Sequence, residues 1–117
     1  MTGSDGSPGH PRKYGTFPRK IRTYVLDKKV ITLPFAIHSS SGLTAQTLHL
    51  DGRGLLRSGY FADIIAFDPK TIADQTTYDD PEVLAAGMKY VLVNGKLAVD
   101  GSKFTNTFAG RALKSAH

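Results

Sequence analysis

The sequence predicts an α+β chain, with loop and helices in residues 1–50 and antiparallel strands in residues 51–117. In the first half, apolar residues recur at the spacing of a helix face. In the second half, short apolar runs alternate with turns rich in Gly, Asn and Asp. A chain of 117 residues is enough for one small domain but not for two. We therefore expect the end of one domain joined to part of another.

Residues 1–15 are expected to form a loop that leads into a helix over residues 17–27. The loop is interrupted by residues that disfavour regular structure, namely Gly3, Gly6, Pro8, Gly9, Pro11 and Gly15. Thr16 is a suitable N-cap for the helix, and Pro18 lies in its first turn, where a missing N–H is tolerated. The apolar face of this helix consists of Phe17, Ile21, Tyr24 and Val25.

A second helical stretch is predicted over residues 33–40. Thr32 is its expected N-cap, and Gly42 is expected to end it. Thr44 then caps a short helix that reaches Leu48.

The predicted strands begin after residue 50, where the period of the apolar residues changes. Residues 62–67 (Ala-Asp-Ile-Ile-Ala-Phe) are typical of a buried strand, and Asp68-Pro69 is typical of a turn. Residues 70–87 are polar and contain Pro81, so we expect an excursion from the sheet.

A β-hairpin is predicted from two strands, residues 88–93 and 96–99, that flank Asn94-Gly95. Both central residues of a type I′ turn need a positive φ, which Asn and Gly adopt readily. Asp100-Gly101 is expected to form the next turn.

The formal net charge of +5 permits nucleic-acid binding. The basic residues concentrate between residues 12 and 29, where the interspersed Phe17 and Tyr24 are expected in a helix core. The sequence therefore favours a solvated basic helix face and no nucleic-acid partner. A steep salt dependence of DNA binding would be the signature of the alternative.

No apolar stretch approaches the ~20 residues of a membrane span, so no membrane contact is expected. The first residues lack the basic-then-apolar pattern of a signal peptide, so we expect a cytoplasmic location. The chain has no Cys, which excludes disulfides and thiolate metal ligands.

Asp5 and Arg12 are the residues best suited to chemistry. A carboxylate beside Gly6 can approach a metal or a substrate closely, although an Asx-turn is the simpler interpretation of Asp5. The guanidinium of Arg12 can bind a carboxylate through two hydrogen bonds, although a solvated surface Arg is the simpler interpretation.

The other candidates for chemistry are weaker. A catalytic zinc usually needs three protein ligands, and the four His residues form no closely spaced pair. We expect His38 and His49 to be ordinary helical residues and the terminal His117 to be frayed. Residues 39–41 (Ser-Ser-Ser) lack the Gly-x-Ser-x-Gly pattern of a serine nucleophile.

Three groups of motifs occur along the chain in a distinctive order. The first is Ser4-Asp5-Gly6, His10-Pro11-Arg12 and residues 14–19 (Tyr-Gly-Thr-Phe-Pro-Arg). The second is residues 53–57 (Arg-Gly-Leu-Leu-Arg) and residues 59–69, which include a Gly-x-x-Ala-Asp pattern. The third is Ala73-Asp74, Thr77-Tyr78, Asp80-Pro81 and residues 90–95 (Tyr-Val-Leu-Val-Asn-Gly). In this order they resemble the C-terminal part of the N-acyl-D-amino-acid deacylases, or D-aminoacylases, of the amidohydrolase superfamily.

The resemblance implies a metal-dependent β/α (TIM-like) barrel and a small β-sandwich built from both chain ends. Residues 1–50 would supply the end of the last barrel strand, the active-site loop and the following helices. Residues 51–117 would supply the C-terminal part of the sandwich. The implied substrate is an N-acyl-D-amino acid, which a zinc-dependent hydrolase would cleave to a carboxylate and a D-amino acid.

The resemblance also implies roles for two residues. Asp5 matches the family Asp that lies at the metal and acts as general base toward the hydrolytic water, so it is also a candidate metal ligand. A residue with that role belongs at the C-terminal end of a barrel strand. Arg12 matches the family Arg that binds the carboxylate of the D-amino acid.

The chain departs from the family pattern in ways that bear on activity. The family's His-x-His pair, its metal-binding Cys and its later metal-binding His residues are absent, and the loop from Asp5 to Arg12 is shorter. One loop carboxylate offers too few ligands for a tight zinc site, so we expect the isolated chain to bind no zinc tightly and to be inactive. Strands that lack their partners have exposed edges, which favour self-association or binding of a barrel partner.

Two other functions stay open from the sequence. One is a non-catalytic β-module, or a split-enzyme subunit that completes a barrel in trans. The other is a different amidohydrolase activity, of the hydantoinase or dihydroorotase type, against which the segment His10-Pro11-Arg12 argues.

Overall fold

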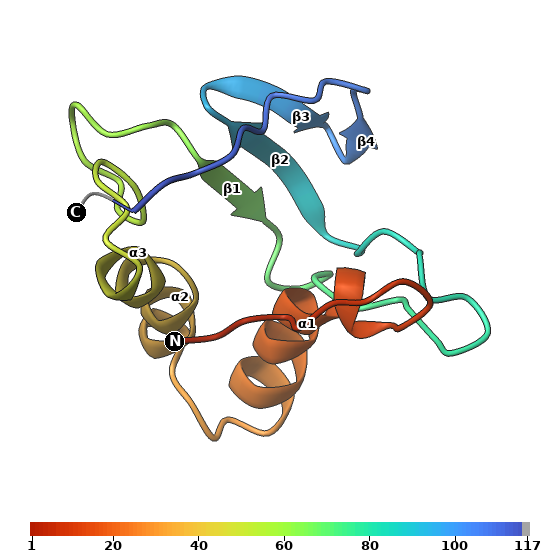
Figure 1. The fold of residues 1–117 in the computed structure, drawn as a ribbon. Coiled ribbons are helices and arrows are strands. Elements are labelled where there is room, and N and C mark those ends of the chain that lie inside the picture. The colour runs from red at the N-terminus through yellow and green to blue at the C-terminus, as the bar shows by residue number, and fades with distance from the viewer. Residues whose placement is uncertain (116–117) are drawn as a thin grey trace.

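The computed structural model describes residues 1–115 and divides them into a helical half and a sheet half (Figure 1). The helices are α1 (Arg12–Arg19), the π-helix η1 (Lys20–Asp27), α2 (Leu33–Ser40) and α3 (Gly42–Thr47). The strands are β1 (Ile64–Phe67), β2 (Met88–Val93), β3 (Lys96–Asp100) and β4 (Lys103–Phe104). They form one antiparallel sheet in the order β1-β2-β3-β4. The predicted combination of helices and a small antiparallel sheet is confirmed.

The first helix begins at Arg12, so its predicted start after Thr16 is wrong. Pro11 occupies the N-cap position, and its carbonyl accepts a hydrogen bond from the N–H of Gly15 at 2.9 Å. Thr16 lies inside α1, where its hydroxyl donates to the carbonyl of Arg12 at 2.8 Å. Because Pro18 has no N–H, α1 lacks one helical hydrogen bond there, and the chain continues directly as the wider π-helix η1.

The apolar face of this continuous helix is only partly covered. Ile21 is buried, but Phe17 and Tyr24 stay 41% and 45% exposed, so their predicted core positions are wrong for the described chain. The physical reason is the small size of the helical half, in which α2 packs against η1 and covers one side of it.

The next two helices confirm one predicted cap and correct another. The hydroxyl of Thr32 accepts a hydrogen bond from the N–H of Phe35 at 3.3 Å, as expected of an N-cap of α2. The N-cap of α3 is Ser41, whereas Thr44 lies inside the helix, so the cap predicted at Thr44 is wrong. His49 follows α3 with a φ of 51°, outside the helix in which it was expected.

The basic residues of the helices are not simply a solvated face, which corrects the expectation from charge. The ammonium of Lys20 donates to the hydroxyls of Thr2 and Ser39 at 2.6 Å each and to that of Ser40 at 3.0 Å. Burial lowers the pKa of Lys20. The N–H of Thr2 also donates to the carbonyl of Ser39 at 2.8 Å, so the N-terminal segment is tied to α2 beside this cation.

The sheet half contains the predicted hairpin. Asn94 and Gly95 have φ values of 50° and 78°, so the type I′ turn between β2 and β3 is confirmed. The next turn differs from the prediction, because its positive φ values belong to Gly101 and Ser102. The first strand is not buried as predicted, since Ile65 is 50% exposed on β1, at the edge of the described sheet.

Residues 70–87 connect the two halves, which the prediction of a plain excursion missed. The turn at Asp68-Pro69 is confirmed by the N–H of Lys70, which donates to the Asp68 carboxylate at 2.9 Å. Ile72 then lies fully buried, and its carbonyl accepts a hydrogen bond from Nε of Arg22 at 2.7 Å. The segment therefore fastens the sheet to the helix η1.

The C-terminal segment runs back along the sheet toward the loop after α3 (Figure 1). The side-chain amide of Asn94 donates to the carbonyl of Ala109 at 2.7 Å. The guanidinium groups of Arg53 and Arg111 lie 4.2 and 4.7 Å from the ring centre of Phe61. His117, expected to be frayed, lies outside the described residues. None of the helices within residues 1–115 combines the length and apolar character that crossing a membrane requires.

Candidate active site

Asp5 lies on the N-terminal loop, close to the start of α1. Its backbone φ is 46°, and its side chain is 90% exposed. The local turn is made by the neighbouring Ser4, whose hydroxyl accepts a hydrogen bond from the N–H of Gly6 at 3.3 Å. The loop runs directly over the helix, because a Cβ atom added to Gly6 would lie 2.9 Å from the Cα of Lys13. The carboxylate of Asp5 is thus presented to solvent beside the first turn of α1.

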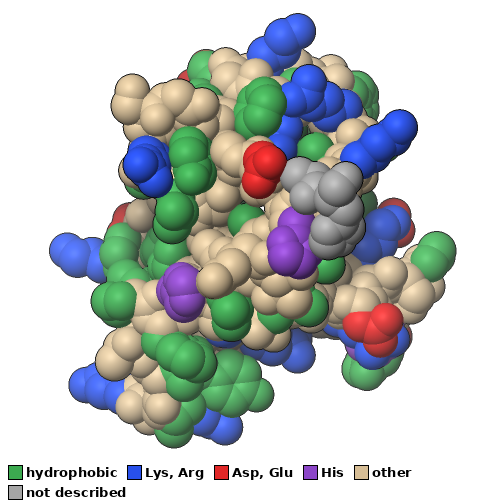
Figure 2. Space-filling view, turned by 60° about the vertical axis from the view of Figure 1, so that its left-hand side comes forward, with side chains coloured by type: hydrophobic (Ala, Val, Ile, Leu, Met, Phe, Trp, Pro, Cys, Tyr) green, Lys and Arg blue, Asp and Glu red, His purple; other side chains and the backbone are tan. Residues whose placement is uncertain are grey.

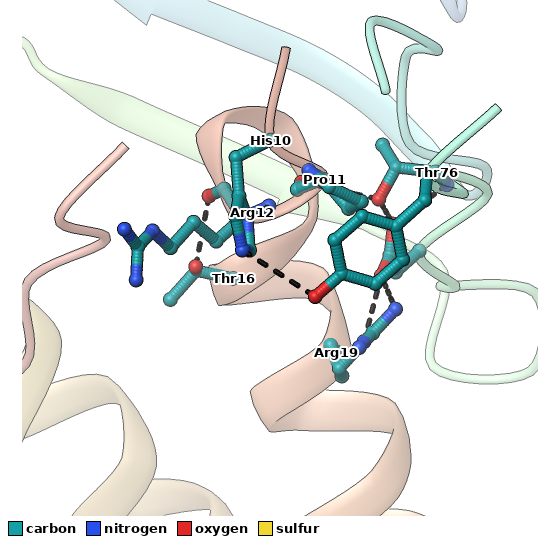
Figure 3. A network of polar contacts seen from close by, with 8 residues as sticks. His10, Pro11, Arg12, Thr16, Arg19 and Thr76 are labelled. Carbon is teal, nitrogen blue, oxygen red and sulfur yellow. Dashed lines mark hydrogen bonds and ion pairs between the residues drawn. The ribbon is translucent and has the colours of Figure 1, made fainter. Parts of the chain in front are cut away.

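Arg12 is the first residue of α1 and pairs with Asp5. Nη1 of Arg12 lies 3.4 Å from Oδ2 of Asp5, and the Arg12 side chain is 42% exposed. The N–H of Arg12 donates to Nδ1 of His10 at 3.1 Å, which satisfies one backbone donor at the start of the helix. In Figure 3 the guanidinium extends away from Thr76 and Arg19. The structure therefore brings the two predicted site residues together, seven positions apart in sequence.

A cavity of about 240 Å³ opens between the start of α1 and the segment 74–78. His10, Arg12 and Arg19 line it from the helical side, and Asp74 and Tyr78 line it from the other. The ring of Tyr78 meets the ring of His10 edge-on at 5.3 Å, and its hydroxyl lies 3.5 Å from Nε2 of His10 (Figure 3). Cationic and hydroxyl groups at such a cavity suit an anionic ligand.

Asp74 is a buried acidic residue in the lining of this cavity. Its side chain is only 5% exposed, and its carboxylate accepts hydrogen bonds from Nε of Arg19 at 2.7 Å and from the N–H of Thr76 at 2.8 Å. Burial alone would raise the pKa of Asp74, but the hydrogen bonds from Thr76 and Arg19 outweigh burial and lower the pKa.

Comparison with known proteins connects this geometry to one family. The model of the amidohydrolase family matches residues 1–99, which is most of the chain. The chain belongs to the amidohydrolase family. Over 117 residues it is 45% identical to a D-aminoacylase from Alcaligenes xylosoxydans xylosoxydans, which covers 97% of this chain and 24% of that protein. The resemblance to the N-acyl-D-amino-acid deacylases that the sequence motifs indicated is confirmed.

Solved structures of related amidohydrolases share the fold of this segment. A crystal structure of D-aminoacylase superposes with a TM-score of 0.90 at 42% identity and covers 97% of this chain and 25% of its own. The N-acyl-D-glutamate deacylase from Bordetella bronchiseptica, complexed with zinc and a phosphonate inhibitor, superposes with a TM-score of 0.80 at 38% identity. That match covers 86% of this chain and 23% of the deacylase. The amidohydrolase chain described here thus spans about a quarter of the length of the relatives it matches.

The residues of this amidohydrolase segment do not make a zinc site by themselves. Within residues 1–115, no three His, Cys, Asp or Glu side chains gather at a distance that could hold a metal ion. A catalytic zinc usually needs three protein ligands, and Asp5 offers one carboxylate, which pairs with the guanidinium of Arg12. The donor set therefore does not fit a zinc ion held by the described residues alone.

Sequence reasoning missed Asp74, Arg19 and Tyr78 as parts of this region of the amidohydrolase. The pattern Asp74-x-Thr76 could have indicated a local turn, because Asp often bonds the backbone two residues further on. No local pattern pairs Asp74 with Arg19, which lies 55 positions earlier in the chain. Because the basic residues between 12 and 29 were interpreted as solvated, the pairing of Arg19 with Asp74 was not predicted.

The buried carboxylate of Asp74 leads to a prediction about acid stability. The pKa of Asp74 is lowered on folding, so its ionised form stabilises the fold above the usual pKa of 3.8, and this contribution is lost as the pH falls through the lowered pKa. Changing Asp74→Asn is expected to reduce the free energy of unfolding by on the order of 1–3 kcal/mol near neutral pH. Urea unfolding should show that this difference narrows as the pH falls below 3.8 and through the lowered pKa of Asp74.

The exposed Asp51 provides the control for that measurement. Asp51→Asn makes the same chemical change on the turn after α3 and should leave the free energy of unfolding nearly unchanged at both pH values. A loss of stability in Asp74→Asn that is equally large in acid and at neutral pH would contradict the prediction.

Proposed function

We propose that this chain forms the C-terminal segment of a metal-dependent amidohydrolase that cleaves N-acyl-D-amino acids to a carboxylate and a D-amino acid. The observation that carries the proposal is the pairing of Asp5 with Arg12 at 3.4 Å, in a chain that is 45% identical to a D-aminoacylase. A carboxylate and a guanidinium side by side suit a reaction that needs a proton acceptor and a site for a carboxylate.

In this proposal Asp5 is the general base. Its carboxylate would take a proton from the attacking water and later deliver that proton to the leaving amine. Asp5 would then be ionised again for the next turnover. The exposure of Asp5 supports this role, because an attacking water and a substrate can reach its oxygens. The backbone of Asp5 is left-handed, and its neighbours Ser4 and Gly6 form the local turn.

Arg12 is the proposed site for the carboxylate of the D-amino acid. A guanidinium can donate two parallel hydrogen bonds to a carboxylate, which orients the substrate as well as binding it. Arg12 lies at the N-terminal end of α1, where the helix dipole also favours an anion. The distance of 3.4 Å to Asp5 leaves Arg12 loosely paired, so a substrate carboxylate can compete for its donors.

The proposal assigns metal binding and the rest of the barrel to polypeptide outside this chain. Residues 1–50 would form the end of the last barrel strand with its active-site loop and helices, and residues 51–117 would form part of a small β-sandwich. The edge strand β1 and the apolar side chains at the surface support a missing partner, either in the same polypeptide or in a separate subunit (Figure 2). Among these exposed residues are Phe35, Leu56, Ile65, Tyr90, Phe104 and Phe108. Without that partner, the same surfaces would favour self-association.

A grafted enzyme tests the proposal. Residues 1–117 would replace the matching C-terminal segment of the Alcaligenes D-aminoacylase, which supplies the remaining three-quarters of the enzyme. With zinc added, the grafted enzyme is expected to hydrolyse N-acetyl-D-amino acids, whereas the isolated 117-residue chain is expected to show no turnover. The product amine would be measured against the matched variant Asp5→Ala of each protein.

Two results would contradict the proposal. Turnover by the isolated zinc-loaded chain, above its Asp5→Ala control, would place a complete site within these residues. A folded grafted enzyme that acts on a hydantoin or on dihydroorotate, but not on N-acetyl-D-amino acids, would favour the other amidohydrolase activity.

A further inference from the structure

Asp74 and Thr76 join a segment from the sheet half to the first turn of α1. The hydroxyl of Thr76 lies 2.6 Å from the carboxylate of Asp74 and 3.1 Å from the carbonyl of Pro11, so it can donate to either. Pro11 precedes Arg12 directly, and its carbonyl also accepts the N–H of Gly15 at 2.9 Å. A contact on Pro11 therefore acts on the backbone that carries Arg12.

The helix sits directly on the carboxylate of Asp74. A Cβ atom added to Gly15 would lie 2.4 Å from Oδ1 of Asp74, so only a glycine allows this approach. One turn further along α1, Nη2 of Arg19 pairs with Asp74 at 2.6 Å. Asp74 thus holds α1 at three successive places, namely at Pro11 through Thr76, at Gly15 by close packing and at Arg19 by an ion pair.

The side chain of Arg12 is only loosely held. It is 42% exposed, and within residues 1–115 its ion pair is the loose one with Asp5. Its backbone, in contrast, is held on both sides, because its N–H donates to His10 and its carbonyl accepts from Thr16. The placement of the first turn of α1 therefore sets the point from which the side chain of Arg12 extends.

We infer that Asp74 is a positioning residue for substrate binding, which fixes α1 so that Arg12 can bind the carboxylate of the substrate. This inference rests on the proposed function. In this role Asp74 would contact neither the substrate nor the reacting atoms and would act through Pro11, Gly15 and Arg19. Two hydrogen bonds to a carboxylate need good alignment, and a displacement of about 1 Å can cost on the order of 10²-fold in rate.

The expected kinetic signature separates positioning from chemistry. Arg12 would contact the same carboxylate in the bound substrate and in the transition state. A change that misplaces Arg12 should therefore raise KM and leave kcat nearly unchanged. A role of Asp74 in general stability alone would lower the amount of active enzyme and leave KM unaltered.

The first experiment uses the grafted enzyme with Asp74→Asn and with Thr76→Val. Both variants are expected to raise KM for an N-acetyl-D-amino acid by about 10- to 100-fold, with kcat largely preserved. In an Arg12→Ala background, adding Asp74→Asn should have little further effect on KM, because the two residues act through one contact. The control is Asp63→Asn, which alters another Asp paired with an Arg, directly before β1.

The second experiment needs no activity. Hydrogen exchange of the 117-residue chain, followed by mass spectrometry, is expected to speed up in residues 10–16 of Asp74→Asn and to stay unchanged there in Asp63→Asn. The inference would be overturned by an unchanged KM in both Asp74→Asn and Thr76→Val, or by effects of Asp74→Asn and Arg12→Ala on KM that are fully additive. Unaltered hydrogen exchange in residues 10–16 would overturn it as well. A grafted enzyme without any turnover before mutation would instead count against the proposed function, and the exchange result would still decide whether Asp74 holds this turn.

Discussion

Changing Asp5→Asn in the grafted enzyme is expected to lower kcat by roughly 10²- to 10⁴-fold, the usual contribution of a general base. The amide of Asn cannot accept the proton of the attacking water and so cannot return it to the leaving amine. KM should change little, because the binding of the substrate carboxylate is assigned to Arg12. Steady-state kinetics with an N-acetyl-D-amino acid and saturating zinc would measure both constants.

Asn is the most informative replacement at this position. Asp5 has a φ of 46°, a left-handed conformation that Asn adopts about as readily as Asp and more readily than Ala. The side chain is 90% exposed, so an amide meets no steric conflict and leaves no buried group unpaired. Asp51→Asn in the same enzyme is the matched control, and its kcat should equal that of the unmodified enzyme. An Asp5→Asn variant that keeps its kcat would remove Asp5 from the mechanism.

The largest expected loss of stability follows from Gly87→Ala. Gly87 has a φ of 77° and lies just before β2. A Cβ atom there would lie 2.4 Å from the backbone nitrogen of Ile72 and 2.5 Å from its Cα. Backbone atoms of a fully buried residue cannot move aside as a flexible side chain can. The left-handed backbone and the overlap together should reduce the free energy of unfolding by on the order of 2–5 kcal/mol.

Gly59→Ala is the matched control for this prediction. Gly59 has a similar φ of 83°, but a Cβ atom there would meet nothing within 4 Å. Its replacement by Ala should therefore reduce the free energy of unfolding only by the cost of a left-handed backbone, about 1–2 kcal/mol. Urea unfolding of the 117-residue chain would compare the two variants. If both variants lost the same free energy of unfolding, the steric overlap between Gly87 and Ile72 would not contribute, and the prediction would be wrong.

The approach of Gly87 to Ile72 matters for the site as well as for stability. Ile72 accepts the hydrogen bond from Arg22 of η1, and Asp74 follows two residues later. If the start of β2 moves away from Ile72, the contact of Asp74 with α1 is expected to loosen too. We therefore expect Gly87→Ala to raise KM in the grafted enzyme in the same direction as Asp74→Asn.

Local signals predicted much of the fold correctly. Thr32 caps α2 and Asn94-Gly95 forms the hairpin turn, because each depends on the conformational preference of one or two residues. The predicted start of α1 was wrong by about one turn. The helix begins before the capping signal at Thr16, with Pro11 at its N-cap and Gly15 packed closely on Asp74. Asp5 and Arg12 could be singled out as the candidate site because their motifs resemble those of a known family.

The sequence by itself determined the α+β class, the hairpin, the family and the two residues that we assign to chemistry. Only the tertiary structure decided which groups hold those residues in place. Arg19 was expected in water and instead pairs with the buried Asp74, while Lys20 ties the N-terminal segment to α2. The physical reason is one of range. Turns and caps depend on neighbours within a few residues, whereas the pairing of Arg19 with Asp74 spans 55 positions and forms only when the sheet half folds back against α1.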